Sequence, residues 1–374
     1  MSLVLIFFAS VTAFMLVYYS IPMIIRVANN NQLYDSPDGK RKVHSTNTPR
    51  LGGVSVFGAI VLSLVCWIFA FEQDLKLHFI APGLIILFFT GLRDDIADLK
   101  PKTKLSLQLL AIALFTFGAD IRIHSFYGIF GLQELPYWFS VMFTFFCYVV
   151  IINAMNLIDG IDGLAGGLAA IVSITYGVWF YLIGQQMICL IAFIHAAAQV
   201  AFLRFNISQD PRLRIFMGDC GSMIAGGIIA VLTIRFIETT QGNIVYFLSA
   251  GPSVALGIVI IPLFDTLRVF VIRVSKGKSP FTADRNHLHH LFIDMGLTHR
   301  VASAVLYGIN IGFITLSLSL AYLPIVSHLL IIFFSGIVVL NLIPSFLVWL
   351  RRKRLPVLVE KENPLGIDVE VGKS

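Results

Sequence analysis

Three acidic residues in an otherwise apolar stretch, Asp94, Asp95 and Asp98, are the first side chains whose spacing could support chemistry. On a helix Asp94 and Asp98 would share a face, whereas Asp95 would be turned away by about 100°. Adjacent carboxylates repel each other unless a cation or a proton lies between them, so the string is a candidate cation site. A charged helix end beside Arg93 and Lys100 is the alternative, and this short string alone does not exclude it.

A second string places four polar side chains at a strict three-residue step: Asn153, Asn156, Asp159 and Asp162. In a tight 3₁₀ turn these side chains would eclipse one another, and in an α-helix they would drift slowly around one side. Gly160 and Gly163 follow the two acids and would let a ligand approach the backbone closely. Unpaired polar groups are costly in an apolar setting, so this spacing indicates binding rather than a plain loop.

The third string is Phe216-Met-Gly218-Asp219-Cys-Gly221-Ser222, which opens a predicted apolar helix. An acid is favoured at a helix N-terminus by the helix dipole, so a simple cap is the alternative explanation for Asp219. A functional role is favoured because Asp219 is predicted on the same side of the protein as the other acids.

The fourth string, Asp284-Arg285-Asn286-His287-Leu-His289-His290, offers a guanidinium and three imidazoles. Such groups can donate several hydrogen bonds to phosphate oxygens. Zinc is the competing ligand, since histidine commonly binds it. No cysteine accompanies these histidines, and the nearby basic residues would oppose a cation, so phosphate is favoured.

The composition indicates the elements that must position these strings. The chain has 374 residues, of which 57% are hydrophobic and 13% charged, and its mean hydropathy is +0.86. A soluble domain carries about 25% charged residues. We therefore predict an all-α polytopic membrane protein with about eleven transmembrane helices. The predicted spans are roughly 3–26, 52–71, 77–92, 105–119, 137–155, 164–183, 186–203, 222–238, 246–270, 301–321 and 326–350.

The basic residues predict the orientation. On this span map only Lys76, Arg122 and Arg235 fall on the N-terminal side, and the other 24 of the 27 lysines and arginines fall on the opposite side. The positive-inside rule makes that opposite side cytoplasmic, with the N-terminus outside and the C-terminus inside. All four strings then lie at the cytoplasmic face. We expect one integral-membrane catalytic domain over 1–354, a flexible cytoplasmic tail over 355–374, and no nucleic-acid partner despite the net charge of +6.

Carboxylates and amides beside basic residues suit a magnesium-bridged diphosphate, because carboxylates hold the hard cation and the cation holds phosphate oxygens. Arginine and histidine would neutralise charge that develops on the transferred group. A site at the lipid boundary requires a membrane-bound acceptor. The residues alone thus predict metal-assisted phosphoryl transfer to a lipid, and they do not identify the sugar.

The four strings, together with Pro49-Arg-Leu-Gly52-Gly53 before the second span, resemble the polyprenyl-phosphate N-acetylhexosamine-1-phosphate transferases. The His-x-His-His form is similar to the bacterial WecA type, which acts on undecaprenyl phosphate and GlcNAc-1-phosphate. The related muramoyl-pentapeptide enzymes have three adjacent histidines, which this chain lacks. The resemblance covers nearly all predicted spans, and five motifs in the same order are a specific signal.

The resemblance implies a reaction in which UDP-GlcNAc and undecaprenyl phosphate give undecaprenyl-diphospho-GlcNAc and UMP, with Mg²⁺ or alternatively Mn²⁺. It implies that Asp219 binds the metal with help from Asn156. Asp94 and Asp95 would lie near the lipid phosphate, one of them as a base. We expect direct attack by the lipid phosphate, since this nucleophile needs positioning most of all.

The remaining site residues are also assigned by resemblance. Asp159 and Asp162 would serve the nucleotide, in the same string as Asn153, and Phe216 would stack on uracil. Lys104, at the cytoplasmic start of the fourth span, is a further candidate for the lipid phosphate. The diphosphate or the sugar would be held by Arg285, His287, His289 and His290.

Two other functions stay open at this stage. Asp94-Asp95-x-x-Asp98 resembles the magnesium-diphosphate motif of an intramembrane prenyltransferase, although the histidine string has no place there. The Gly and Pro breaks in the ninth span are also typical of a transporter, although transporter polar groups lie nearer mid-membrane. Among transferases, GalNAc or a 6-deoxy sugar would suit the same motifs, and a homodimer is an open alternative.

Overall fold

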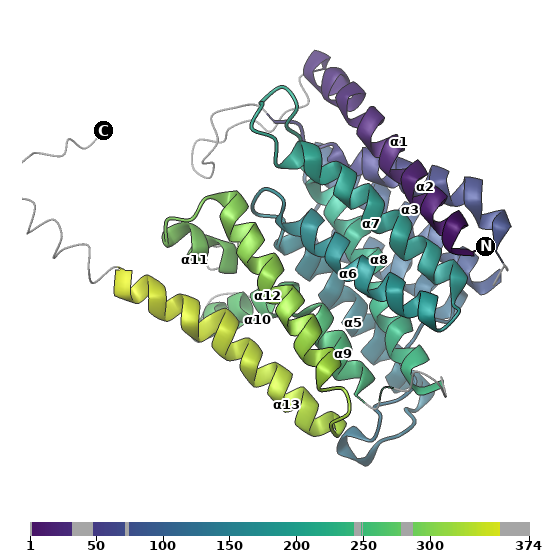
Figure 1. Ribbon diagram of the computed structural model, residues 1–374, viewed down its shortest axis with the longest axis vertical. Helices are drawn as coiled ribbons and strands as arrows, with labels where there is room; N and C mark the ends of the chain where they lie inside the picture. The colour runs from purple at the N-terminus through teal and green to yellow at the C-terminus, as the bar shows by residue number, and fades with distance from the viewer. Residues whose placement is uncertain are drawn as a thin grey trace, which may run out of the picture.

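The computed structural model describes residues 2–31, 48–71, 75–242, 248, 250–277 and 287–351, and this part of the chain is helical (Figure 1). The α-helices are α1 (Ser2–Asn30), α2 (Gly52–Trp67), α3 (Ile80–Ala97), α4 (Pro101–Ala113), α5 (Tyr137–Leu157), α6 (Leu164–Leu182), α7 (Gln186–Asn206), α8 (Gly218–Gly242), α9 (Gly251–Ile258), α10 (Ile260–Ser275), α11 (Leu288–Asp294), α12 (His299–Ser319) and α13 (Ile325–Gly336). Short 3₁₀ helices cover Ile68–Ala70, Leu75–Phe79 and Ile129–Gly131, and π-helical segments at Leu114–Gly118 and Ile337–Leu342 continue α4 and α13. Over these ranges there is no β-strand, and β pairing is confined to isolated bridges such as that between Ser125 and Glu134, so the predicted all-α class is confirmed.

Eight helices of the described chain are long and apolar enough to cross a membrane, and the bent pair α9–α10 raises the number to nine. That pair bends by 79° at Val259, within the predicted ninth span and between Gly257 and Pro262. Helices α3 and α4 occupy the predicted third and fourth spans, but α3 ends in a charged turn and α4 has only 13 residues. The count of eleven and the sides of the two termini therefore stay predictions. The predicted tail, 355–374, lies outside the described residues.

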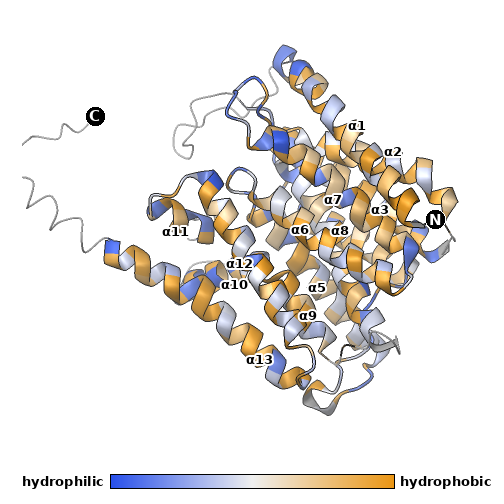
Figure 2. Cartoon of the chain, in the orientation of Figure 1, coloured by the Kyte–Doolittle hydropathy of each residue, from blue (hydrophilic) through white to orange (hydrophobic). Residues whose placement is uncertain are grey.

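Helix α8 forms the centre of the bundle and is almost wholly buried. It packs against α2, α3, α5, α6, α7 and α9. Figure 2 shows hydrophobic residues along the lengths of the helices and hydrophilic ones gathered near their ends and around α11. Because α8 is central, its first turn, which carries Asp219, contacts the ends of its neighbours.

Close approach between α2 and the start of α8 requires glycine. The Gly52 and Gly53 N–H groups donate to the carbonyl oxygens of Phe216 and Met217 at 3.0 and 2.9 Å, and Phe216 N–H donates to the Pro49 carbonyl at 2.8 Å. A Cβ on Gly53 would collide with the backbone of Gly221, which cannot move aside. The Pro49–Gly53 segment is therefore hydrogen-bonded to the backbone at the start of α8, and this close approach explains the two glycines.

We expect Gly53→Ala to lower the midpoint of thermal unfolding in detergent by several degrees, because forcing a methyl group into a packed interface costs about 1–3 kcal/mol. Gly58→Ala is the matched control on the same helix, since a Cβ there would meet nothing within 4 Å. The control should leave the midpoint unchanged or raise it, because alanine is the better helix former. Equal midpoints for the two variants would contradict the proposed close approach.

Candidate active site

Asp95 fixes the first turn of α8. Its two carboxylate oxygens accept hydrogen bonds from the backbone N–H groups of Asp219 and Cys220 at 2.8 and 2.9 Å. These N–H groups have no intrahelical partner at a helix start, and the helix dipole favours a negative charge there. Gly91, one turn earlier on α3, lies so close to Cys220 that a Cβ would collide with its backbone. Asp95 thus joins α3 to α8 and positions the side chain of Asp219.

Lys104 lies between two other carboxylates. Its Nζ donates to Asp94 Oδ2 at 2.8 Å and to Asp219 Oδ2 at 2.5 Å. The second oxygen of Asp94 accepts from the backbone N–H of Leu99 at 2.6 Å, in the turn that connects α3 to α4. The structure therefore brings Asp94, Lys104 and Asp219 together, whereas Asp98 is exposed at the end of α3.

Asn156, near the end of α5, completes this cluster. Its Nδ2 donates to Asp219 Oδ1 at 3.1 Å and to Ser222 Oγ at 2.9 Å, so its Oδ1 is the oxygen that remains for a cation. Asn153 lies one turn earlier and exchanges amide hydrogen bonds with Gln108 on α4, at 3.0 and 3.4 Å. Asn153 therefore holds α4 against α5 and does not contact the carboxylates in this structure.

Helix α5 ends at Leu157, so the two acids of the second string lie in the loop before α6. Burial, followed by the negative charges of Asp219 and Asp95, raises the pKa of the Asp159 carboxyl to about 7. Such a carboxyl exists in both protonation states near neutral pH, and a bound cation would favour the charged state.

Asp162 is held in a different way. Its carboxylate accepts a hydrogen bond from Arg214 and lies 3.6 Å from His299 Nδ1. Burial raises the pKa of Asp162, but the bonds from His299 and Arg214 outweigh it and place that pKa below its usual range. Gly163, with φ of 84°, donates to Asn206 Oδ1 at 2.6 Å and accepts from Tyr307, so α7 and α12 fix this loop.

Phe216 lies in the segment before α8 and is linked to the α5–α6 loop through Arg214, which contacts both the Phe216 ring and Asp162. The Arg214 guanidinium lies 5.5 Å from the centre of the Phe216 ring, a cation–π arrangement. The ring is partly exposed, and its backbone is held by Pro49 and Gly52. A partly exposed, fixed aromatic ring can stack on a planar base.

The histidine string begins α11. Asp265 on α10 accepts from His287 Nδ1 at 2.8 Å and from the Leu288 N–H at 2.6 Å. The rings of His289 and His290 lie 4.3 Å apart, and that of His287 stacks on His289 at 5.5 Å. Arg285 falls outside the described residues.

His289 connects this string to the second one. It is buried, and its imidazole lies against Gly160, where a Cβ would collide with it. Burial lowers the pKa of His289 to about 3, so the ring is neutral at pH 7. Its Nδ1 has no hydrogen-bond partner within the described part of the chain. The ring edge that faces Gly160 is the Nε2–Cε1 edge, so Nε2 is the atom that a ligand beside Gly160 would meet.

The donor set suits a hard cation that shares its ligands with a phosphate. Asp219 offers a carboxylate and Asn156 an amide oxygen, and Mg²⁺ takes one or two protein oxygens together with phosphate oxygens and water. Within the described ranges, no three His, Cys, Asp or Glu side chains are placed to enclose a metal by themselves. Four carboxyl groups, those of Asp94, Asp95, Asp159 and Asp219, lie close together, and Lys104 bridges two of them, so a bound cation would relieve their mutual repulsion.

Three residues outside the predicted set also contribute: Asp265, Arg214 and His299. Asp265 is an acid near the inner end of the predicted ninth span, where a carboxylate is costly without a partner, but the sequence assigns it no role. Arg214 lies two residues before Phe216. A basic residue so close to the third string could have been predicted to pair with one of the acids. No local pattern distinguishes His299.

The comparisons with known proteins cover most of these residues. Residues 77–237 match the family profile described as Glycosyl transferase family 4. A Salmonella typhi protein named undecaprenyl-phosphate alpha-N-acetylglucosaminyl 1-phosphate transferase is 33% identical over 299 residues, which are 76% of this chain and 78% of that protein. A protein of the same name from Escherichia coli strain K12 is 33% identical over 284 residues, covering 74% and 73%. A Bacillus subtilis strain 168 protein named probable undecaprenyl-phosphate N-acetylglucosaminyl 1-phosphate transferase is 32% identical over 295 residues, covering 78% of both.

The fold and the site define a multi-pass membrane protein with carboxylates, an amide and a lysine gathered at one end of the bundle. The chain belongs to glycosyl transferase family 4 and, within it, to the polyprenyl-phosphate N-acetylhexosamine-1-phosphate transferases. The family expected from the motifs is confirmed, and it is favoured over the prenyltransferase and the transporter.

We expect Asp265→Ala to increase hydrogen–deuterium exchange in residues 287–294 at least about tenfold, because each hydrogen bond to a charged acceptor contributes about 1.5–3 kcal/mol. Asp294→Asn is the control, since Asp294 is an exposed acid in α11 itself. Exchange is measured by mass spectrometry on the protein in detergent. Unchanged protection of α11 in Asp265→Ala would contradict the positioning role of Asp265.

Proposed function

We propose that this protein transfers N-acetylglucosamine 1-phosphate from UDP-GlcNAc to undecaprenyl phosphate and releases UMP. The observation that carries the proposal is the cluster of Asp94, Lys104, Asn156 and Asp219 at the ends of four helices. The names of the relatives support the same donor and acceptor. Such a reaction would begin the membrane stage of a bacterial surface polysaccharide.

In the proposed reaction, the lipid phosphate replaces UMP as the group joined by a phosphoanhydride bond to the sugar phosphate. An oxygen of the lipid phosphate attacks the phosphorus that carries the sugar, and the bond from that phosphorus to the bridging oxygen breaks. UMP leaves with this oxygen and its electron pair. The lipid phosphate is already an anionic nucleophile at neutral pH, so we favour direct attack, in which the protein supplies alignment and charge stabilisation.

Mg²⁺, or alternatively Mn²⁺, is the proposed cofactor, held by Asp219 and Asn156. When bound, the cation would neutralise charge on the diphosphate. The gathering of several carboxyl groups around Asp219 supports this assignment, because a cation would relieve their repulsion. Asp94 would hold Lys104 toward the lipid phosphate, and Asp95 would act through the backbone of Asp219.

The donor would occupy the side of the cluster formed by the α5–α6 loop and α11. Phe216 would stack on uracil, and Asp159 and Asp162 would serve the nucleotide. The diphosphate or the sugar would then lie among His287, His289, His290 and Arg285. The position of His289 beside Gly160 supports a single donor pocket built from both strings.

The proposed location is the bacterial cytoplasmic (inner) membrane, with the active site on the cytoplasmic face. The distribution of lysine and arginine supports this orientation, with the N-terminus outside and the C-terminus inside.

The transfer is tested with purified protein, UDP-GlcNAc, undecaprenyl phosphate and Mg²⁺, by measuring UMP release and the mass of the lipid product. We expect Asp219→Asn to lower kcat by at least about a hundredfold, as for the loss of one group that stabilises transition-state charge. Asp98→Asn is the matched control, since Asp98 is an exposed acid of the first string. No UMP release by the wild type, or full activity of Asp219→Asn, would overturn the proposal.

Lys104→Gln should raise the KM for undecaprenyl phosphate at least about tenfold, because it removes a charge-assisted hydrogen bond to phosphate. The KM for UDP-GlcNAc should change much less. Lys102→Gln is the control, since Lys102 is exposed on the same turn of α4. An unchanged KM for the lipid in Lys104→Gln would remove Lys104 from the acceptor site.

A further inference from the structure

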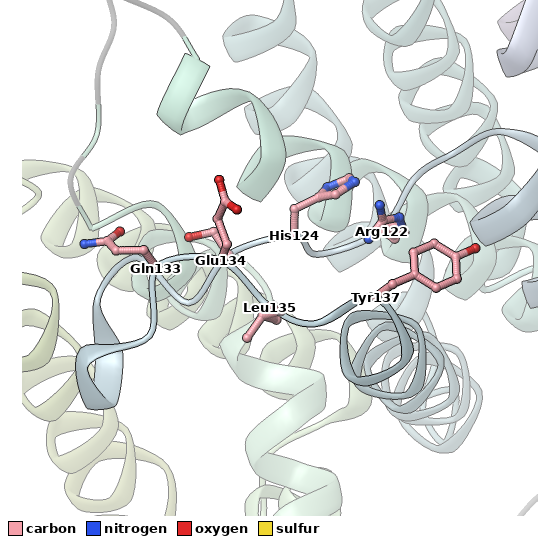
Figure 3. A pocket seen from close by; sticks show the side chains of 7 residues that line it. Arg122, His124, Gln133, Glu134, Leu135 and Tyr137 are labelled. Carbon is pink, nitrogen blue, oxygen red and sulfur yellow. The ribbon is translucent and has the colours of Figure 1, made fainter.

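A polar pocket lies at the end of the bundle opposite the candidate active site (Figure 3). Its volume is about 490 Å³, within the range of small-ligand sites. Helix α8 separates the two sites: Asp219 stands in its first turn, and Glu238 near its other end contacts the pocket residue His124. With a rise of about 1.5 Å per residue, these two positions on α8 are roughly 28 Å apart. The pocket is lined by Arg122, His124, Ser125, Gln133, Glu134, Leu135 and Tyr137.

The walls of this pocket are held by the rest of the protein. Glu238 accepts from the His124 N–H at 2.9 Å and also contacts the His124 ring. The bridge between Ser125 and Glu134 closes the connection between α4 and α5. Arg122 donates to Ser140 Oγ at 2.9 Å and lies 4.8 Å from the centre of the Tyr137 ring. A ligand would therefore meet a largely preformed site.

Charges of both signs line the pocket. Figure 3 shows the side chains of Arg122, His124 and Glu134 on the same side of the connecting chain. Glu134 is exposed, and its carboxylate forms no ion pair with another described residue. Arg122 Nε also lies 3.7 Å from Asp120 Oδ1, so a bound phosphate would share the guanidinium with Asp120. An anionic ligand would be repelled by Glu134, and a cationic one by Arg122. A ligand that carries both an anionic and a cationic group matches this lining.

The surroundings indicate a lipid. Tyr137 and Trp138 begin α5 with 61% and 64% of their surface exposed, and aromatic residues at a span end are typical of the membrane interface. Met142 and Phe146 follow Trp138 at four-residue steps and are equally exposed, so these three form one apolar stripe along α5. A headgroup in the pocket would place its acyl chains on this stripe.

We propose that this pocket binds a phospholipid whose headgroup carries a phosphate and a primary ammonium. The phosphate lies toward Arg122, the ammonium donates hydrogen bonds to Glu134, and the acyl chains lie along Trp138, Met142 and Phe146. A trimethylated ammonium has no N–H to donate and binds more weakly. A glycerol headgroup has no cation for Glu134.

The test is native mass spectrometry of the purified protein in detergent, titrated separately with dioleoyl phosphatidylethanolamine, phosphatidylcholine and phosphatidylglycerol. We expect the ethanolamine lipid to bind most tightly. Glu134→Gln should weaken that lipid at least about fivefold and the choline lipid less, because only the ethanolamine lipid loses a hydrogen bond to the carboxylate as well as the charge attraction. Arg122→Gln should weaken both, and Arg235→Gln, a change at the same end of α8 outside the lining, should weaken neither.

Equal affinity for the three lipids, tightest binding of the glycerol lipid, or an unchanged affinity in Glu134→Gln would each overturn the proposal. Thermal unfolding checks that every variant is folded. If Arg122→Gln unfolds, Glu134→Gln decides alone, since Glu134 is exposed and its pairing with Ser125 is a backbone bridge. None of these outcomes depends on the sugar transfer at the opposite end of the protein.

Discussion

The site depends on the bond between the Asp95 carboxylate and the first turn of α8. This bond satisfies two backbone N–H groups that a buried helix start would otherwise leave without partners. Glycines at 53 and 91 let α2 and α3 approach the same turn, so three helices meet at one point. Asp219 is thereby held between Lys104 and Asn156. Loss of this junction would disperse the cluster even if every side chain in it were retained.

The three acids of the first string, which lie within five consecutive residues, have three different surroundings. Asp95 caps α8, Asp94 binds Lys104, and Asp98 is exposed. Lys104 separates Asp94 from Asp219, and Asp159 adds a further carboxylate whose pKa is raised by burial and by its acidic neighbours. Carboxyl groups gathered in this way suit a divalent cation that arrives with an anionic ligand, because the cation offsets the repulsion among the carboxylates and the ligand.

The sequence predicted the all-helical class, the break in the ninth span and the family, because each rests on composition or on several motifs together. It did not predict that the four polar residues spaced three apart, from Asn153 to Asp162, have different partners. Helix α5 ends at Leu157, so Asn153 pairs with Gln108, Asn156 reaches Asp219, and Asp162 pairs with Arg214. The pairing of Asp265 with His287 was not predicted, because the two residues are 22 positions apart and nothing local joins them. Such pairings follow from tertiary contacts rather than from spacing.

The proposed role of Asp219 is to hold a divalent cation in contact with the donor diphosphate. Electron–nuclear double resonance on protein with Mn²⁺ and UDP-GlcNAc tests it directly, because a strong isotropic ³¹P hyperfine coupling requires phosphate oxygens bound to the ion. We predict a ³¹P coupling in the wild type and in Asp98→Asn, and its loss in Asp219→Asn. A coupling of equal strength in Asp219→Asn, or none in the wild type, would contradict this account.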